Sequence, residues 1–217
     1  SMVKGGRGGL SKEARKKIRD LMGPRPAAFL FQLIFAWVVI FGTIVLAEYL
    51  NAWWATVLAI LVVATRQNVL ALLVHEQAHH LGFSSRWGDL FVNLTAGYPL
   101  VFITVQDYAQ IHLPHHKYFF DENDPDFRRK SGEEWAFPMP RSQLFGLFLK
   151  DVLGFNVIKL YKGKRLKKNQ EIRFKRKLEI PKWAHNAYLL VALAILVATG
   201  TWDEFLIYWM IPLLTIF

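Results

Sequence analysis

The stretch NVLALLVHEQAHH, at residues 68–80, decides the fold because an apolar run passes directly into three histidines within it. The apolar run begins at Ala52, and its one interruption is the polar group from Arg66 to Asn68. A membrane-crossing helix needs about 20 predominantly apolar residues. We therefore predict one long helix from Ala52 to His80 whose last turns rise out of the lipid. On this helix Arg66 lies near the headgroups or faces the protein interior, because a charge that faces lipid in mid-bilayer is costly.

The composition agrees with an integral membrane protein. Of the 217 residues, 53% are hydrophobic, and the mean hydropathy is +0.20. The chain has no cysteine, which excludes disulfides, thiolate catalysis and cysteine-ligated zinc. Any metal site must therefore use histidine, carboxylate or amide ligands, which suit iron, zinc, copper or manganese.

Hydropathy and charge together predict an all-α membrane bundle. We expect a basic tail at residues 1–26 and one membrane domain at residues 27–217, built from two transmembrane hairpins. The predicted spans lie at about residues 27–47, 52–74, 184–200 and 204–217, and the last of them is incomplete. The positive-inside rule places the basic region 75–183, with both of its histidine clusters, on the cytoplasmic side. The basic run from Lys159 to Lys177 lies between spans, which favours contact with anionic headgroups over nucleic acid binding.

The connection between the two histidine clusters is predicted to contain two further helices. A turn leads into a short interfacial or re-entrant helix around Trp87 to Ala96, and a second helix covers Leu100 to Ile111. Pro114 lies inside the second cluster. Proline within a helix costs about 3 kcal/mol, so we expect either a kink or the start of a new helix there.

Six of the seven histidines lie in two clusters with metal-chelating spacing. Residues three or four apart share a face of a helix, which brings His75 together with His79. His80 points about 140° away from His75 on an ideal helix, so it reaches a second metal or is only a neighbour. Because histidine is the commonest metal ligand, the candidate ligands are His75, His79, His80, His112, His115 and His116.

Polar side chains near the second cluster are candidate partners for these imidazoles. A ligating imidazole usually donates its other N–H to a carboxylate, a carbonyl or water. The candidates for this role are Tyr108, Asp107, Asp121, Asp124 and Asp126. His185, at the entry to the third predicted span, is interpreted as an interfacial residue.

The first cluster also fits a different class of enzyme. His75-Glu76-Gln77-Ala78-His79 has the HExxH pattern of zinc metalloproteases, in which Glu76 would be the general base. An intramembrane protease of this kind needs one further zinc ligand, and it leaves the second cluster without a role. A non-catalytic membrane scaffold would use neither cluster.

In this hydropathy context the two clusters resemble the membrane fatty acid desaturase and hydroxylase superfamily. That family is marked by HxxxH or HxxxxH, then HxxHH, then a late H/QxxHH box, around two irons on the cytosolic face of a four-helix membrane bundle. His75 to His80 match the first box and His112 to His116 the second, and no third box precedes Phe217. We therefore expect a C-terminally truncated member of the family, whose closing ligands follow in a longer protein.

The resemblance implies O2-dependent desaturation of a fatty acyl chain at two irons held by the histidines. The acyl chain would be carried by a membrane lipid or by a thioester such as acyl-CoA or an acyl-carrier protein. An acyl or carotenoid hydroxylase of the same superfamily is the alternative. Electrons would come from a separate donor of the ferredoxin or cytochrome b5 type, and no nucleic acid partner is expected. No residue is given a catalytic role beyond metal ligation.

Overall fold

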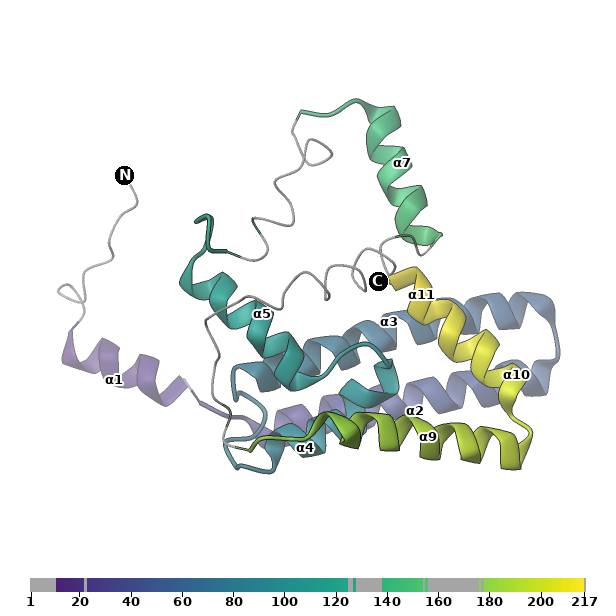
Figure 1. The fold of residues 1–217 in the computed structure, drawn as a ribbon, viewed down its shortest axis with the longest axis horizontal. Coiled ribbons are helices and arrows are strands. Elements are labelled where there is room, and N and C mark those ends of the chain that lie inside the picture. Colours follow the sequence, from purple (N-terminus) through teal and green to yellow (C-terminus); the bar gives the residue numbers. More distant parts are fainter. Residues whose placement is uncertain are drawn as a thin grey trace.

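The computed structural model describes residues 11–21, 23–124, 127, 138–153, 155, 176 and 178–216, and within them the regular secondary structure is all helix, as predicted (Figure 1). The elements, in chain order, are α1 (Lys12–Leu21), α2 (Pro26–Leu50), α3 (Trp53–Ala78), α4 (Gly88–Val92), the π-helix η1 (Asn93–Gly97), the 3-10 helix η2 (Tyr98–Leu100), α5 (Val105–Lys117), α7 (Arg141–Val152), α9 (Lys182–Thr199), α10 (Trp202–Phe205), the π-helix η4 (Leu206–Met210) and α11 (Ile211–Ile216). Most of the basic run from Lys159 to Lys177, and Asp126, lie outside the described residues.

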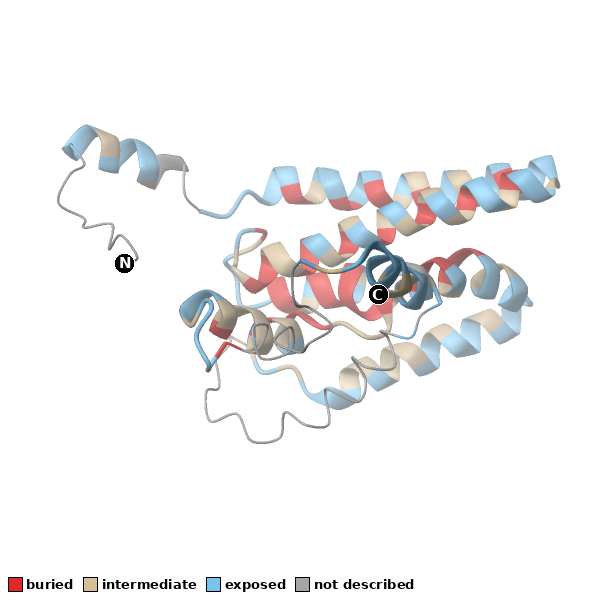
Figure 2. Ribbon diagram, turned by 90° about the horizontal axis from the view of Figure 1, so that it is seen from above, coloured by how far each residue is buried: buried red, intermediate tan, exposed pale blue. Residues whose placement is uncertain are grey.

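Helix α3 is the centre of the bundle. Helix α2 packs along it, and α4, η1, α5 and α11 contact its other sides. The core between these helices is apolar, and its members include Leu33, Ala36, Ile40, Val63, Leu70 and Leu213. Figure 2 shows the buried residues as stripes along the helices, with exposed residues on the outer faces.

Within the part of the chain that the structure describes, three helices are long and apolar enough to cross a membrane: α2, α3 and α9. A fourth crossing results only if Gly88–Leu100 and Val105–Lys117, which meet at a 93° bend, are counted as one broken span. The last predicted span, the incomplete one at about residues 204–217, corresponds to the helical run of α10, η4 and α11. The outward faces carry large exposed apolar side chains, as a lipid-facing surface requires: Phe31, Val38, Phe41, Val45, Leu61, Val191 and Val197.

Helix α3 ends two residues earlier than predicted, and the ending is well defined. His79 is the C-cap, and His80 takes the left-handed conformation with φ 59°. The N–H of His80 donates to the Gln77 carbonyl at 2.8 Å, and the N–H of Leu81 donates to the Glu76 carbonyl at 3.0 Å. This bond pair is the Schellman motif, which satisfies carbonyls that a helix end leaves open. The expected direction of His80, 140° around a continuing helix, is therefore wrong.

Helix α5 starts later than predicted and passes through Pro114. The helix covers Val105–Lys117, and Pro114 lies inside it and is buried. No new helix begins at Pro114, because α5 continues through it. Because the helix continues, His112 and His116 keep the four-residue spacing that puts them on one face.

Two stacked indoles hold the irregular backbone of η1 and η2 against the bundle. The rings of Trp37 and Trp209 lie 5.4 Å apart and nearly parallel. The indole N–H of Trp37 donates to the Thr95 carbonyl at 2.9 Å, and that of Trp209 donates to the Pro99 carbonyl at 2.8 Å. Non-helical backbone at membrane depth is tolerated where protein satisfies its polar groups, and these indoles do so here.

Candidate metal centre

The start of helix α5 is fixed by side chains on both sides of it. Thr104 is the N-cap: its hydroxyl oxygen accepts from the Asp107 N–H at 3.0 Å and donates to the Asp107 carboxylate at 2.9 Å. The buried Asn93 of η1 accepts from the Val105 N–H at 2.8 Å and donates to the Gln106 side chain at 2.7 Å. Asp107 therefore serves the helix cap, while Asn93 sets where α5 begins relative to η1.

Four imidazoles from the two clusters converge between helices α3 and α5. One nitrogen from each of His75, His79, His112 and His116 lies within 4.8 Å of the others. The ring of His112 is the most central, with its centre 4.5 Å from that of His75 and 4.4 Å from that of His116. The predicted chelating faces of the two clusters thus point at one another.

The spacing of the nitrogens fits ligands of a shared metal ion. The Nε2 atom of His112 lies 3.0 Å from Nε2 of His79 and 2.8 Å from Nε2 of His116. Two nitrogens bound at about 2.1 Å to one ion, at right angles, lie about 3.0 Å apart. Three Nε2 atoms therefore lie close together, and each contact between two of them can hold at most one proton. A bound cation would satisfy the lone pairs of all three nitrogens better than hydrogen bonds between the imidazoles can.

Two imidazoles of the cluster are held in the neutral form that metal ligation requires. Burial, and then the neighbouring histidines, lower the pKa of His112 to about 4. The pKa of His79 is lowered for the same reasons, with burial the larger cause. Both groups therefore offer a free lone pair at neutral pH.

His115 is not one of the four converging histidines, and a buried carboxylate holds it. Its Nδ1 lies 2.9 Å and 3.0 Å from the two oxygens of Asp124, whose side chain is 2% exposed. The Phe120 N–H also donates to this carboxylate at 3.1 Å. Asp124 therefore orients His115 so that its Nε2 is left to ligate. His80, the other candidate outside the four, lies just beyond the end of α3.

The remaining predicted site residues surround the cluster at its edges. The Tyr108 ring stacks on that of His112 at 5.0 Å between centres. The Glu76 carboxylate lies 3.5 Å from Nδ1 of His75, and its side chain is 44% exposed. Asp121 accepts from its neighbour Asn123 in a turn.

His185 packs against η2 and is not among the four converging histidines. Its ring stacks on Tyr98 with 4.7 Å between the centres. It therefore belongs to the contact between α9 and η2, and its interpretation as an interfacial residue stays a prediction.

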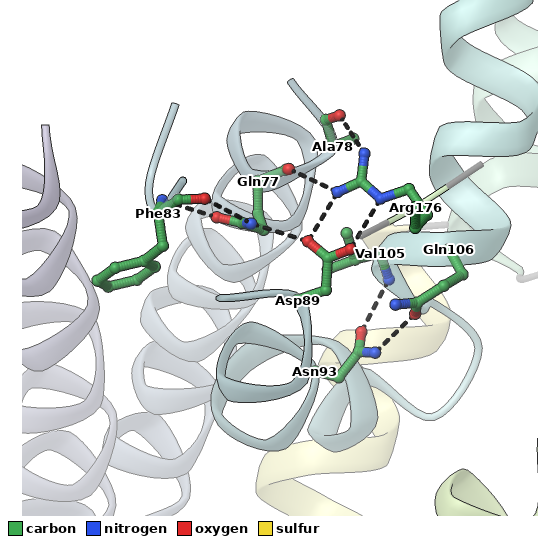
Figure 3. A network of polar contacts seen from close by, with 8 residues as sticks. All are labelled: Gln77, Ala78, Phe83, Asp89, Asn93, Val105, Gln106 and Arg176. Atoms are coloured by element: carbon green, nitrogen blue, oxygen red, sulfur yellow. Dashed lines mark hydrogen bonds and ion pairs between the residues drawn. The ribbon is translucent and has the colours of Figure 1, made fainter. Parts of the chain in front are cut away.

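A buried polar network behind the cluster was missed in the sequence analysis. Figure 3 shows Gln77, Asp89 and Arg176 joined by hydrogen bonds at the end of α3. Gln77 lies inside the first histidine box, but the box pattern does not predict the hydrogen bonds that its side chain makes to Phe83 and Asp89. Asp89 and Arg176 carried no signal, because they are far from each other in the sequence and neither belongs to a motif.

Comparison with known proteins gives a consistent result. Residues 51–217 match the fatty acid desaturase family. The chain is 27% identical over 181 residues to the dihydrorhizobitoxine desaturase of Bradyrhizobium elkanii, an alignment that covers 79% of this chain and 51% of the relative. The chain thus spans about half the length of the curated relative it matches. No solved structure matches the chain significantly.

Proposed function

The chain belongs to the fatty acid desaturase family, and from that premise we propose that it serves O2-dependent desaturation of a fatty acyl chain at two histidine-held irons. The observation that carries the proposal is the convergence of His75, His79, His112 and His116 within the region that matches the family. Either histidine cluster alone is a weak signal, but two clusters that face each other at ligand spacing are difficult to explain as structural residues.

In this proposal the chain's own residues divide the work of holding the metal. His75, His79, His112 and His116 hold one iron, and His115, oriented by Asp124, offers a ligand to the second. His80 is the remaining candidate. When bound, the iron pair would activate O2, which is the oxidant for removal of two hydrogens from an unactivated acyl chain, with electrons from the separate donor. The Asp124 carboxylate keeps the proton on Nδ1 of His115, which leaves Nε2 free to ligate.

An apolar cavity is the proposed binding site for the acyl chain. The cavity has a volume of ≈ 340 Å³ and lies between α9, η2 and η4. Its walls are mainly aromatic and aliphatic, and they include Trp37, Tyr98, Tyr188, Leu193, Trp209 and Met210. Its size falls in the range typical of small-molecule sites. We propose that this cavity receives part of an acyl chain and leaves the polar head of the substrate outside.

Orientation and partners follow from charge and family. We propose that the histidine clusters face the cytoplasm, because the predicted basic regions lie on their side of the spans. A separate ferredoxin or cytochrome b5 type protein would supply electrons. The matched relative is named for dihydrorhizobitoxine, and this name does not identify an acyl carrier. Activity assays should therefore compare two classes of substrate, membrane lipids and acyl thioesters.

Two alternatives predict different results. The HExxH protease needs three protein ligands and an open position on zinc, whereas four imidazoles converge here and Glu76 lies exposed at their edge. A hydroxylase of the same superfamily would use the same residues and differ in product.

Metal analysis with matched variants tests the proposal. We expect about two irons per chain in the purified full-length protein, loss of iron and of desaturation in His112→Ala, and retention of both in Glu76→Gln. Product analysis by mass spectrometry distinguishes a mass loss of two hydrogens from the gain of one oxygen. One zinc per chain, with a proteolytic activity that Glu76→Gln abolishes, would refute the proposal.

A further inference from the structure

Gln77, which lies between His75 and His79 in the sequence, points away from these histidines into the protein. Gln77 lies about 200° around the helix from His75, and it is fully buried. Its amide nitrogen donates to the Phe83 carbonyl at 3.1 Å and to Asp89 Oδ1 at 2.8 Å, and its amide oxygen accepts from the Phe83 N–H at 2.9 Å. The face of α3 opposite the metal ligands is therefore anchored by side-chain hydrogen bonds.

Arg176 closes this anchor from a distant part of the chain. Two nitrogens of its guanidinium donate to the two oxygens of Asp89, each at 2.7 Å. The same group donates to the Ala78 carbonyl at 2.7 Å and to the Gln77 carbonyl at 3.1 Å. These carbonyls belong to the end of α3, where the helix dipole favours a cation. The Arg176 and Asp89 side chains are only 5% and 4% exposed.

The anchor connects the two helices that carry the histidines. Asp89 in α4 is bound to the end of α3, and Asn93, one turn further on, is bound to the start of α5 at Val105. The segment that contains Asp89 and Asn93 is thus hydrogen-bonded to both helices, as Figure 3 shows, and we call it the strut. We therefore expect a shift at either end of this strut to change the distance between His79 and His112.

We infer that Arg176 is a positioning residue for the histidine cluster: its guanidinium fixes the end of α3 on the strut, and so sets the spacing of the imidazoles across the site. The inference rests on the proposed metal-binding function. A buried ion pair is poor evidence for a contribution to stability as such. Support beyond a metal's own ligands, however, typically changes metal affinity about 10–100-fold when it is removed.

The test compares iron retention with stability in the purified full-length protein. Arg176→Gln removes the charge and the fork of donors, Arg176→Lys keeps the charge alone, and Asp89→Asn weakens the same clamp from the other side. Tyr208→Phe is the matched control, because it removes a bond to Glu48 at the opposite end of the bundle. For each variant we measure the rate of Fe(II) loss to a chelator and the thermal midpoint by circular dichroism.

We expect Arg176→Gln to lose iron about 10–100-fold faster than the unmodified protein, Arg176→Lys to fall between the two, and Tyr208→Phe to keep the original rate despite a lower midpoint. Should Arg176→Gln fail to fold, Asp89→Asn must show the same faster loss. Iron loss within twofold of the original rate in a folded Arg176 or Asp89 variant overturns the inference. The inference is also overturned if Tyr208→Phe loses iron as fast as an Arg176 variant that has the same thermal midpoint. If the unmodified protein and His112→Ala both bind no iron, the proposed function itself has failed.

Discussion

The substitution Gly88→Ala probes the tightest packing beside the candidate site. A Cβ added at Gly88 would lie 2.7 Å from Cβ of Phe83, 3.2 Å from the Phe83 carbonyl oxygen and 3.0 Å from Nε2 of Gln77. The Phe83 contacts involve its carbonyl oxygen and the first atom of its side chain, which cannot swing aside. Forcing an extra methyl group into a packed site costs about 1–3 kcal/mol. The gain from alanine in a helix is at most about 1 kcal/mol. We expect a net loss of about 1–2 kcal/mol.

The control for this prediction is the same substitution where space is open. Gly42 lies in α2 with no atom within 4 Å of its would-be Cβ among the residues described. Thermal unfolding in detergent, followed by circular dichroism, compares the two variants. A change of 1 kcal/mol moves the midpoint of a protein of this size by about 2–4 °C. Gly88→Ala should therefore lower the midpoint by roughly 2–8 °C, while Gly42→Ala leaves it unchanged or raises it.

The reasoning also predicts a second readout. A shift of Phe83 or of the Gln77 amide disturbs the anchor behind His75 and His79, so Gly88→Ala should release iron faster as well. If Gly88→Ala is as stable as Gly42→Ala, the turn that follows α3 has more room than the structure gives it, and the packing argument is refuted.

Three further predictions concern the wider site and bundle. Asp124→Asn removes the charged acceptor of His115, and iron affinity measured by competition with a chelator should fall about 10–100-fold; unchanged affinity would show that His115 is not oriented by this contact. The pKa of His112 is lowered from 6.5 to about 4, so the metal-free protein keeps this contribution to stability above pH 6.5 and loses it as pH falls toward 4; midpoints that stay level from pH 7.5 to 4.5 would contradict the burial argument. Tyr208→Phe removes the 2.7 Å hydrogen bond to Glu48 and should cost about 0.5–2 kcal/mol, a loss that urea or thermal unfolding detects; an unaltered midpoint would mean that this bond contributes nothing.

The helices and the facing histidines were predictable because their signals are local. The apolar run of α2, the run that becomes α3 and the four-residue spacing of His75 and His79 are properties of short segments. Helix ends were less predictable. The left-handed turn at His80 has no glycine to announce it, and Pro114 is accommodated inside α5, although proline usually ends or bends a helix.

The support behind the cluster was beyond the reach of a single sequence. The Arg176 side chain meets Asp89 and the end of α3 through contacts that span 87 to 99 residues of chain. No sequence periodicity links residues so far apart. Arg176 also lies in a basic run, and nothing in the sequence distinguishes it from the other lysines and arginines there. Likewise, nothing local separated Asp124, which contacts His115, from Asp107, which caps a helix.

The order in which the ribosome makes the chain gives the clamp a distinct place in time. All four converging imidazoles lie between residues 75 and 116, so the nascent chain contains the complete set while Arg176 is still to be translated. The strut from Asp89 to Asn93 also emerges before it. The Arg176 guanidinium can therefore bind Asp89 and the end of α3 only after both histidine-bearing helices have been synthesised.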